Sequence, residues 1–133
     1  MTAQEKFEHW LDIAQYDLET AQSMLSGGRW LYVVFMCQQA IEKLSKGLYT
    51  LYVDDNIPKI HNIKTIFDYF EDKLPNPITE ERLELFDTLS AYYLNNRYPD
   101  FMRKMSLQVN KEEASKILTD TREVFLWLLT LKP

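Results

Sequence analysis

The stretch Trp30–Tyr52 constrains the fold most, because its pattern suits a long helix that has neighbours on most sides. It opens with eight consecutive apolar residues, 30–37. Apolar side chains then recur three and four positions apart, at Cys37, Ala40, Ile41, Leu44, Leu48 and Leu51. This spacing keeps one stripe of a helix apolar. We therefore expect this stretch to be the central helix of an all-α protein.

The rest of the chain supports the same fold class. Its 133 residues fit one domain, 1–133, which can bury roughly two-thirds of its unfolded surface. Only three glycines and five prolines are present, too few for the many turns of a sandwich or barrel. Helical patterns predict five helices, at about 4–25, 30–52, 63–74, 80–95 and 110–131.

Capping signals mark the ends of these segments. Thr2 and Glu5 have the spacing of a capping box, and Asn110 with Glu113 fits a second cap. Gly27-Gly28 is expected to end the first helix. Pro99 marks a break, and we interpret the segment 97–104, RYPDFMRK, as a solvated and partly basic loop.

The central helix also carries a polar row. Gln39, Lys43 and Lys46 lie three and four apart and so share a face. Folding the chain about Gly27-Gly28 places position i opposite roughly position 55 − i, for two helices of equal rise. By this count Asp12 lies near Lys43, and Asp17 lies near Gln38 and Gln39. The lysines therefore have two possible roles, binding an anion or joining an internal network with Asp12, Asp17 and Glu42.

Charge and hydropathy exclude several classes of protein. The net charge of −5 argues against a protein that coats nucleic acid, although a local basic patch stays possible. No apolar run approaches the roughly 18 residues of a membrane span. The polar N-terminal sequence does not resemble a secretory signal, so we expect a cytoplasmic protein.

The chain offers little for catalysis or metal binding. It has no glycine-rich phosphate loop and no HExxH, CxxC or GxSxG motif. Two histidines and one cysteine give no ligand set for a transition metal, so we expect no metal, no cofactor and no catalytic residues. Cys37 is interpreted as a small buried hydrophobe, Gly47 as a close packing point, and His61 as structural rather than catalytic.

Several segments together resemble the small HEPN-domain proteins, a family named for nucleotide binding in prokaryotes and higher eukaryotes. They are WLDIAQYDLETAQSML, then GGRWLYVVFMCQQAIEKLSKGLY, then His61, then Arg97-Tyr98-Pro99. The resemblance covers nearly the full chain. It implies an up-and-down bundle of four to five helices, usually dimeric, and in many members paired with a nucleotidyltransferase of the MNT type in a toxin–antitoxin module.

Ribonuclease members of the family carry an arginine followed, after four to six residues, by a histidine. This chain departs from that pattern, because no histidine follows Arg97 and no arginine precedes His9 or His61 at the required spacing. Acid–base cleavage by the usual motif therefore lacks one partner. The resemblance thus favours binding over catalysis.

Three hypotheses follow. In the first, a non-catalytic homodimer holds a nucleotide or RNA phosphate and works beside a nucleotidyltransferase, with the phosphate bound by Gln39, Lys43, Lys46, Arg97 and Tyr98. In the second, the chain is a divergent ribonuclease that uses Arg97 and His61. In the third, a structural dimer forms through the apolar surface of Trp30, Tyr32, Val34 and Phe35.

Overall fold

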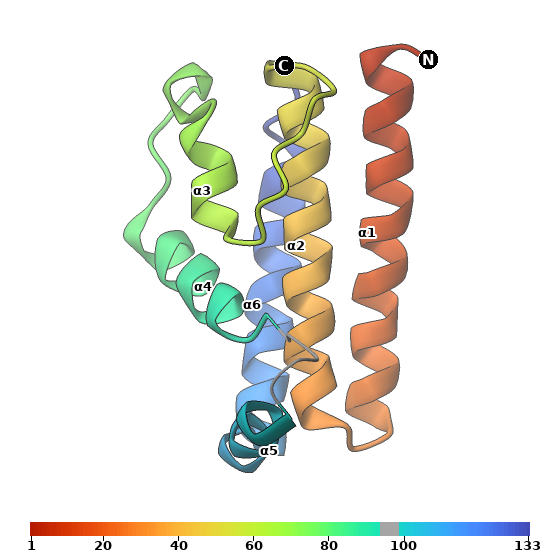
Figure 1. The fold of residues 1–133 in the computed structure, drawn as a ribbon, viewed down its shortest axis with the longest axis vertical. Helices are drawn as coiled ribbons and strands as arrows, with labels where there is room; N and C mark the ends of the chain where they lie inside the picture. The colour runs from red at the N-terminus through yellow and green to blue at the C-terminus, as the bar shows by residue number, and fades with distance from the viewer. Residues whose placement is uncertain (94–98) are drawn as a thin grey trace.

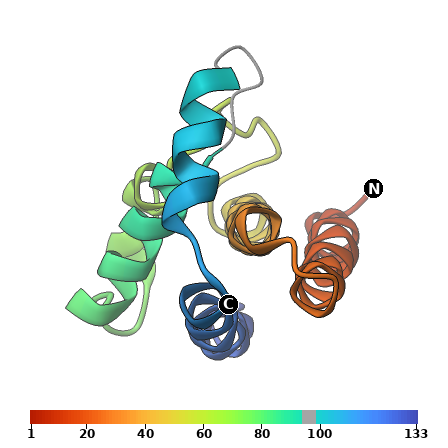
Figure 2. The ribbon, with the colours of Figure 1, turned by 90° about the horizontal axis from the view of Figure 1, so that it is seen from below.

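The computed structural model describes residues 1–93 and 99–133, and the regular structure in these ranges is entirely helical. The elements are α1 (Ala3–Ser26), α2 (Trp30–Tyr52), α3 (Ile63–Asp68), a short 3₁₀ helix η1 (Glu71–Lys73), α4 (Glu80–Ala91), α5 (Pro99–Gln108) and α6 (Lys111–Leu129). Three long helices, α1, α2 and α6, lie alongside one another, and α3 and α4 cover another side of α2 (Figures 1 and 2). The predicted all-α class is confirmed.

Helix α2 is the central element, with the bounds that the sequence predicts. Fourteen of its 23 residues are buried, including the fully buried Ile41, Leu44 and Leu48. It contacts α1, α3, α4, α5 and α6. Viewed along the long axis, α2 lies between α1 on one side and α3, α4 and α6 on the others (Figure 2). Its apolar pattern therefore reflects neighbours on most sides.

Helices α1 and α2 form an antiparallel pair joined at Gly27-Gly28. Gly28 has a positive φ of 74°, which glycine adopts without steric cost. Far from this turn, α1 and α2 pack closely at Gly47. A Cβ added there would lie 3.0 Å from the Cβ of Trp10 and 3.1 Å from Cδ2 of Phe7. The expected close approach at Gly47 is thus made to side chains of α1. The predicted capping box of Thr2 and Glu5 is also present.

Two predicted helices are shorter than expected. The segment predicted as 63–74 divides into α3 and η1, with i→i+3 bonds from the Tyr69 N–H to Ile66 and from the Phe70 N–H to Phe67. Such tighter bonds are common at helix ends. Helix α4 ends at Ala91 instead of residue 95, and the ring of Tyr93 leaves the helix to stack on His61.

The interpretation of 97–104 as a loop is wrong for its second part, because Pro99 begins α5. Proline is favoured in the first turn of a helix, where its missing N–H removes no intrahelical bond. The residue that the sequence predicts as a break therefore starts a helix. Helix α5 lies near the end of the bundle that holds the α1–α2 turn (Figure 1).

Some individual side chains also differ from expectation. The three-and-four spacing of apolar residues in α1 predicts that Ile13 faces the core, but Ile13 is 46% exposed, whereas Phe7, nearer the start of α1, is fully buried. Val34, assigned to a dimer surface, is fully buried within its own chain, whereas Tyr32 is 43% exposed.

Among the described residues, no helix is both long and apolar enough to cross a membrane.

Candidate functional site

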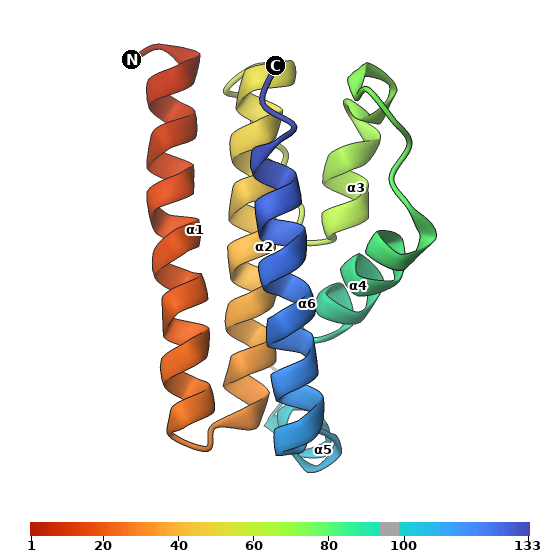
Figure 3. The same cartoon turned by 180° about the vertical axis from the view of Figure 1, so that it is seen from behind.

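The polar row of α2 lies between α1 and the segment 53–62. Gln39, Lys43 and Lys46 are all partly buried. Helix α6 packs on the opposite side of α2 from the segment 53–62, as the front and back views agree (Figures 1 and 3). The three predicted residues therefore share one side of α2, but their partners differ.

Lys43 pairs with Asp17 of α1. Its ammonium contacts the Asp17 carboxylate, whose side chain is only 8% exposed. The sequence count placed Asp12 opposite Lys43, and that assignment is wrong. Side chains lean toward the N-terminus of their own helix. In an antiparallel pair, Lys43 therefore leans toward the Gly27-Gly28 turn while Asp17 leans away from it, and the two side chains meet.

Lys46 pairs with Glu42, one turn earlier in α2. The Glu42 side chain is 5% exposed, and its carboxylate accepts from Lys46 Nζ at 3.1 Å and from Gln38 Nε2 at 2.8 Å. His61 Nδ1 lies 3.2 and 3.3 Å from the two oxygens of the same group. A buried carboxylate is costly unless it is paired and hydrogen-bonded, and these three partners meet that need. We call Gln38, Glu42, Lys46 and His61 the Glu42 cluster.

His61 occupies the solvent side of the Glu42 cluster. Its side chain is 48% exposed, and its ring stacks on Tyr93 with centroids 4.2 Å apart. An ionised carboxylate only accepts hydrogen bonds, so a neutral ring must carry its proton on Nδ1. The lone pair then lies on Nε2, at the other edge of the ring. That nitrogen can accept a proton or, once protonated, donate to an anion.

Neighbouring bonds fix the position of His61. Gln38 Nε2 lies 3.5 Å from the His61 carbonyl oxygen, and Asn62 caps α3 by accepting from the Thr65 N–H at 3.1 Å. Gln39 donates to Gln38 at 2.8 Å, which ties the first residue of the polar row to the Glu42 cluster. The contacts of His61 with Gln38 and Glu42 thus join the start of α3 to the middle of α2.

The two other predicted site residues, Arg97 and Tyr98, lie outside the described residues. Sequence reasoning named Glu42 only as a possible internal partner, and it missed the contacts of Gln38 and Tyr93 with His61. Helical periodicity signals that Gln38, Glu42 and Lys46 share a side, because they are four residues apart. It gives no signal for the contact between Glu42 and His61, which is made across a loop.

Cys37 is not part of this site. It is fully buried on α2, and burial raises the pKa of its thiol to about 12. Thiolate is the reactive form, so this thiol is inert at neutral pH. Within the ranges 1–93 and 99–133, no three residues of the types His, Cys, Asp and Glu group as a metal site.

The fold and the site together define a small helical protein whose central helix is tied to a loop histidine through a buried carboxylate. The HEPN domain family model matches residues 7–131, and the chain therefore belongs to the HEPN family. No curated protein matches the chain.

Two solved structures share the fold. The chain is similar to TT1696 from Thermus thermophilus, with a TM-score of 0.79, 23% identity, and coverage of 94% of this chain and 97% of that one. It is also similar to ST0689, an archaeal HEPN homologue, with a TM-score of 0.74, 25% identity, and coverage of 96% and 98%. The helical arrangement is thus shared over nearly the full length of all three chains.

Proposed function

We propose that this HEPN-family chain holds the phosphate of a nucleotide or RNA without cleaving it. Gln39, Lys43, Lys46, Arg97 and Tyr98 bind the phosphate, and His61 adds a donor beside Lys46. The protein acts as a cytoplasmic homodimer beside a nucleotidyltransferase of the MNT type, in a toxin–antitoxin-like pair. The homodimer and its partner rest on the family resemblance.

The observation that carries this proposal is the sharing of one carboxylate by two basic side chains. Lys46 and a protonated His61 carry two positive charges against the single negative charge of Glu42. A phosphate oxygen placed beside this pair would receive charge-assisted hydrogen bonds, which are stronger than neutral ones. Lys43 contributes less, because Asp17 already neutralises it.

Fluorescence anisotropy with a labelled short RNA, and calorimetry with ATP and ADP, test this proposal. Lys46→Gln and Arg97→Ala are each expected to weaken binding about tenfold, the effect of losing roughly 1.4 kcal/mol of a charged contact. Lys64→Gln is the matched control, because Lys64 is a cation of α3 that pairs with Asp68 and Glu71 and has no part in the proposed site. Absence of binding, with Arg97→Ala changing only stability, would refute the proposal.

The contact between His61 and Glu42 favours a second candidate, a divergent ribonuclease. A carboxylate that orients an imidazole through Nδ1 leaves Nε2 free to act as a general base, the arrangement found in hydrolase triads. Purified protein would then cleave RNA, and His61→Ala would abolish the cleavage. An equal rate of RNA loss with the wild type and with His61→Ala would rule this candidate out.

The dimer itself needs a separate test. Tyr32 is 43% exposed, and Trp30 and Phe35 are partly buried, so these three side chains still offer an apolar surface. An isologous two-fold contact is the commonest form of homo-oligomer. We expect sedimentation equilibrium to give a dimer that Tyr32→Glu dissociates. A wild-type monomer would contradict the dimer but not phosphate binding.

A further inference from the structure

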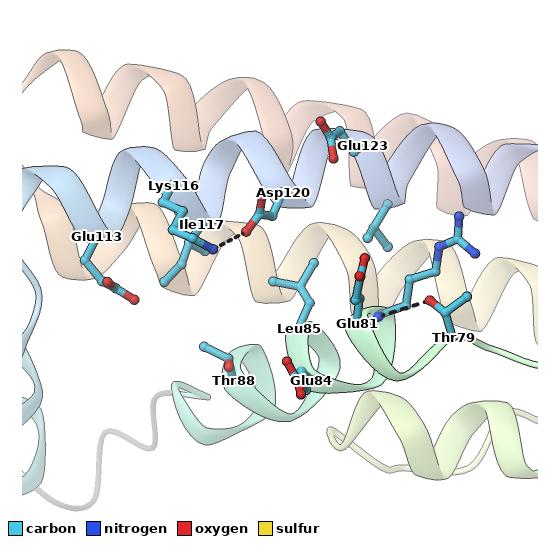
Figure 4. A pocket seen from close by; sticks show the side chains of 12 residues that line it. Thr79, Glu81, Glu84, Leu85, Thr88, Glu113, Lys116, Ile117, Asp120 and Glu123 are labelled. Atoms are coloured by element: carbon cyan, nitrogen blue, oxygen red, sulfur yellow. Dashed lines mark hydrogen bonds and ion pairs between the residues drawn. The ribbon is translucent and has the colours of Figure 1, made fainter.

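A groove runs between α4 and α6, on residues that the Glu42 cluster does not use. It encloses about 530 Å³, and its lining residues come from α4, its N-cap and α6 (Figure 4). Leu85, Ile117 and Val124 form an apolar floor, with 9%, 4% and 7% of their surfaces exposed. This volume falls within the range of protein ligand sites, about 300–1,000 Å³.

The two sides of the groove carry an excess of negative charge. Glu81 and Glu84 come from α4, and Glu113 and Glu123 come from α6, and all four are exposed. In the described part of the chain, these four carboxylates make no ion pair within 4 Å. Figure 4 shows labelled acidic side chains on both helices that flank the groove.

The basic residues of the groove are already engaged. Lys116 pairs with Asp120 at 2.8 Å. The Arg82 guanidinium lies over the ring of Trp127, 4.0 Å from its centroid. One cation of the protein itself thus already lies against an aromatic ring of α6 beside the groove, and neither basic residue of the groove lies within 4 Å of the four glutamates.

We propose that the α4–α6 groove docks a short basic amphipathic segment of a partner protein. Aliphatic side chains of the segment pack on Leu85, Ile117 and Val124, while its lysines and arginines face the glutamates of the two sides. From Glu113 to Val124, α6 extends about 16 Å at 1.5 Å per residue, which matches a helix of about eleven residues. Nucleic acid is excluded as the occupant, because its phosphates would meet the same carboxylates.

The probe for this proposal is a fluorescein-labelled peptide of three Lys-Leu-Lys-Lys repeats, measured by anisotropy against the full chain. Two peptides of equal length serve as controls. Replacing each leucine by glycine removes the apolar stripe, and replacing each lysine by glutamate reverses the charge. We expect the first peptide to bind, with an affinity that falls as salt screens the charges, and both controls to bind at least about tenfold more weakly.

A pair of matched double variants tests the location. Glu84→Lys with Glu113→Lys reverses two charges in the groove, whereas Asp87→Lys with Glu112→Lys makes the same net change on the same two helices outside it. The groove variant is expected to lose about tenfold or more in affinity relative to the other variant. Thr88→Trp fills the groove without a charge change and is expected to block the peptide as well.

Three results would overturn the proposal. The first is the absence of binding by the basic amphipathic peptide. The second is equal binding by the two double variants, which would indicate only general attraction to an acidic protein. The third is loss of self-association in the groove variant without peptide, which would assign the groove to a second copy of the chain. Circular dichroism of each variant shows that folding is retained, and Thr88→Trp gives an independent answer if a double variant unfolds.

Discussion

Lys43 and Lys46 lie less than one turn apart on α2, yet their environments differ. Lys43 meets a single buried carboxylate from α1, and the two charges cancel inside the helix pair. Lys46 shares Glu42 with His61, whose ring reaches solvent. We call the Lys43–Asp17 pair closed, because each side chain has the other as its ion-pair partner, and the Glu42 cluster open, because its His61 side chain is 48% exposed. The difference arises from the neighbours, because α1 supplies the partner of Lys43, whereas the loop before α3 brings His61 to the partner of Lys46.

Breaking the closed pair should have the largest effect on stability. Lys43→Met leaves Asp17 buried without its partner, and such a change costs about 3–5 kcal/mol. Urea unfolding measures this loss as a lower midpoint with an unchanged slope. The double variant with Asp17→Leu should recover much of the loss, because a buried pair replaced by apolar residues is often neutral. A loss below about 1 kcal/mol for Lys43→Met would mean that Asp17 reaches water.

Opening the Glu42 cluster should cost less. Glu42→Gln keeps the shape of the side chain but removes its charge, so the hydrogen bonds from Lys46 and His61 become neutral-acceptor bonds, each weaker by about 1 kcal/mol and together by about 2 kcal/mol. The loss stays below that of Lys43→Met, because the new amide oxygen still accepts a hydrogen bond and the side chain of His61 is half exposed. Differential scanning calorimetry compares the two variants directly. A larger loss for Glu42→Gln would reverse the assignment of closed and open sites.

The side of α2 that faces α6 gives a third environment, which pH can test. Burial raises the pKa of the Cys37 thiol to about 12 from its ordinary value of 9.0. The protonated thiol is favoured in the folded state, so its contribution to stability is complete below pH 9 and decreases as pH rises toward 12. Between pH 8 and 10, the free energy of unfolding of the wild type should decrease by about 1.4 kcal/mol more than that of Cys37→Ala. An equal decrease in the two proteins would show that the Cys37 thiol ionises in the folded state as readily as in the unfolded state.

Much of the fold could be predicted from the sequence, because periodicity and capping are local. The bounds of α2, the capping box at Thr2 and the cap at Asn110 follow from neighbouring residues alone. The end of α4 and the start of α5 could not be predicted in the same way. Tyr93 leaves its helix to stack on His61, a contact between residues far apart in sequence. Pro99 begins α5, and local preference allows a proline both at a break and in the first turn of a helix.

The arrangement of the candidate site could be predicted only in part, because part of it depends on contacts that are not local. Helical spacing places Gln39, Lys43 and Lys46 on one side of α2, and the partners of the two lysines depend on side-chain direction and on a loop. The count about Gly27-Gly28 gives the backbone register correctly at Gly47, which meets Phe7 and Trp10. It misses Asp17 as the partner of Lys43, because equal-rise counting ignores the lean of side chains along their helices.

The smallest effect should come from Gly47, which lies one turn beyond Lys43 on α2. A Cβ there would lie 3.0 Å from Trp10 and 3.1 Å from Phe7, so Gly47→Ala forces these side chains to move, at about 2 kcal/mol. Alanine is about 1 kcal/mol more favourable than glycine in the middle of a helix, so part of this cost is offset. The net decrease in the free energy of unfolding, measured with urea, should therefore be about 1 kcal/mol. Gly27→Ala is the control, because its added Cβ would lie 3.4 Å from the Ser23 carbonyl oxygen, an ordinary contact. If Gly47→Ala instead stabilises the protein, then α1 can shift away from α2, and the closed character of the Lys43–Asp17 pair must come from charge rather than from tight packing.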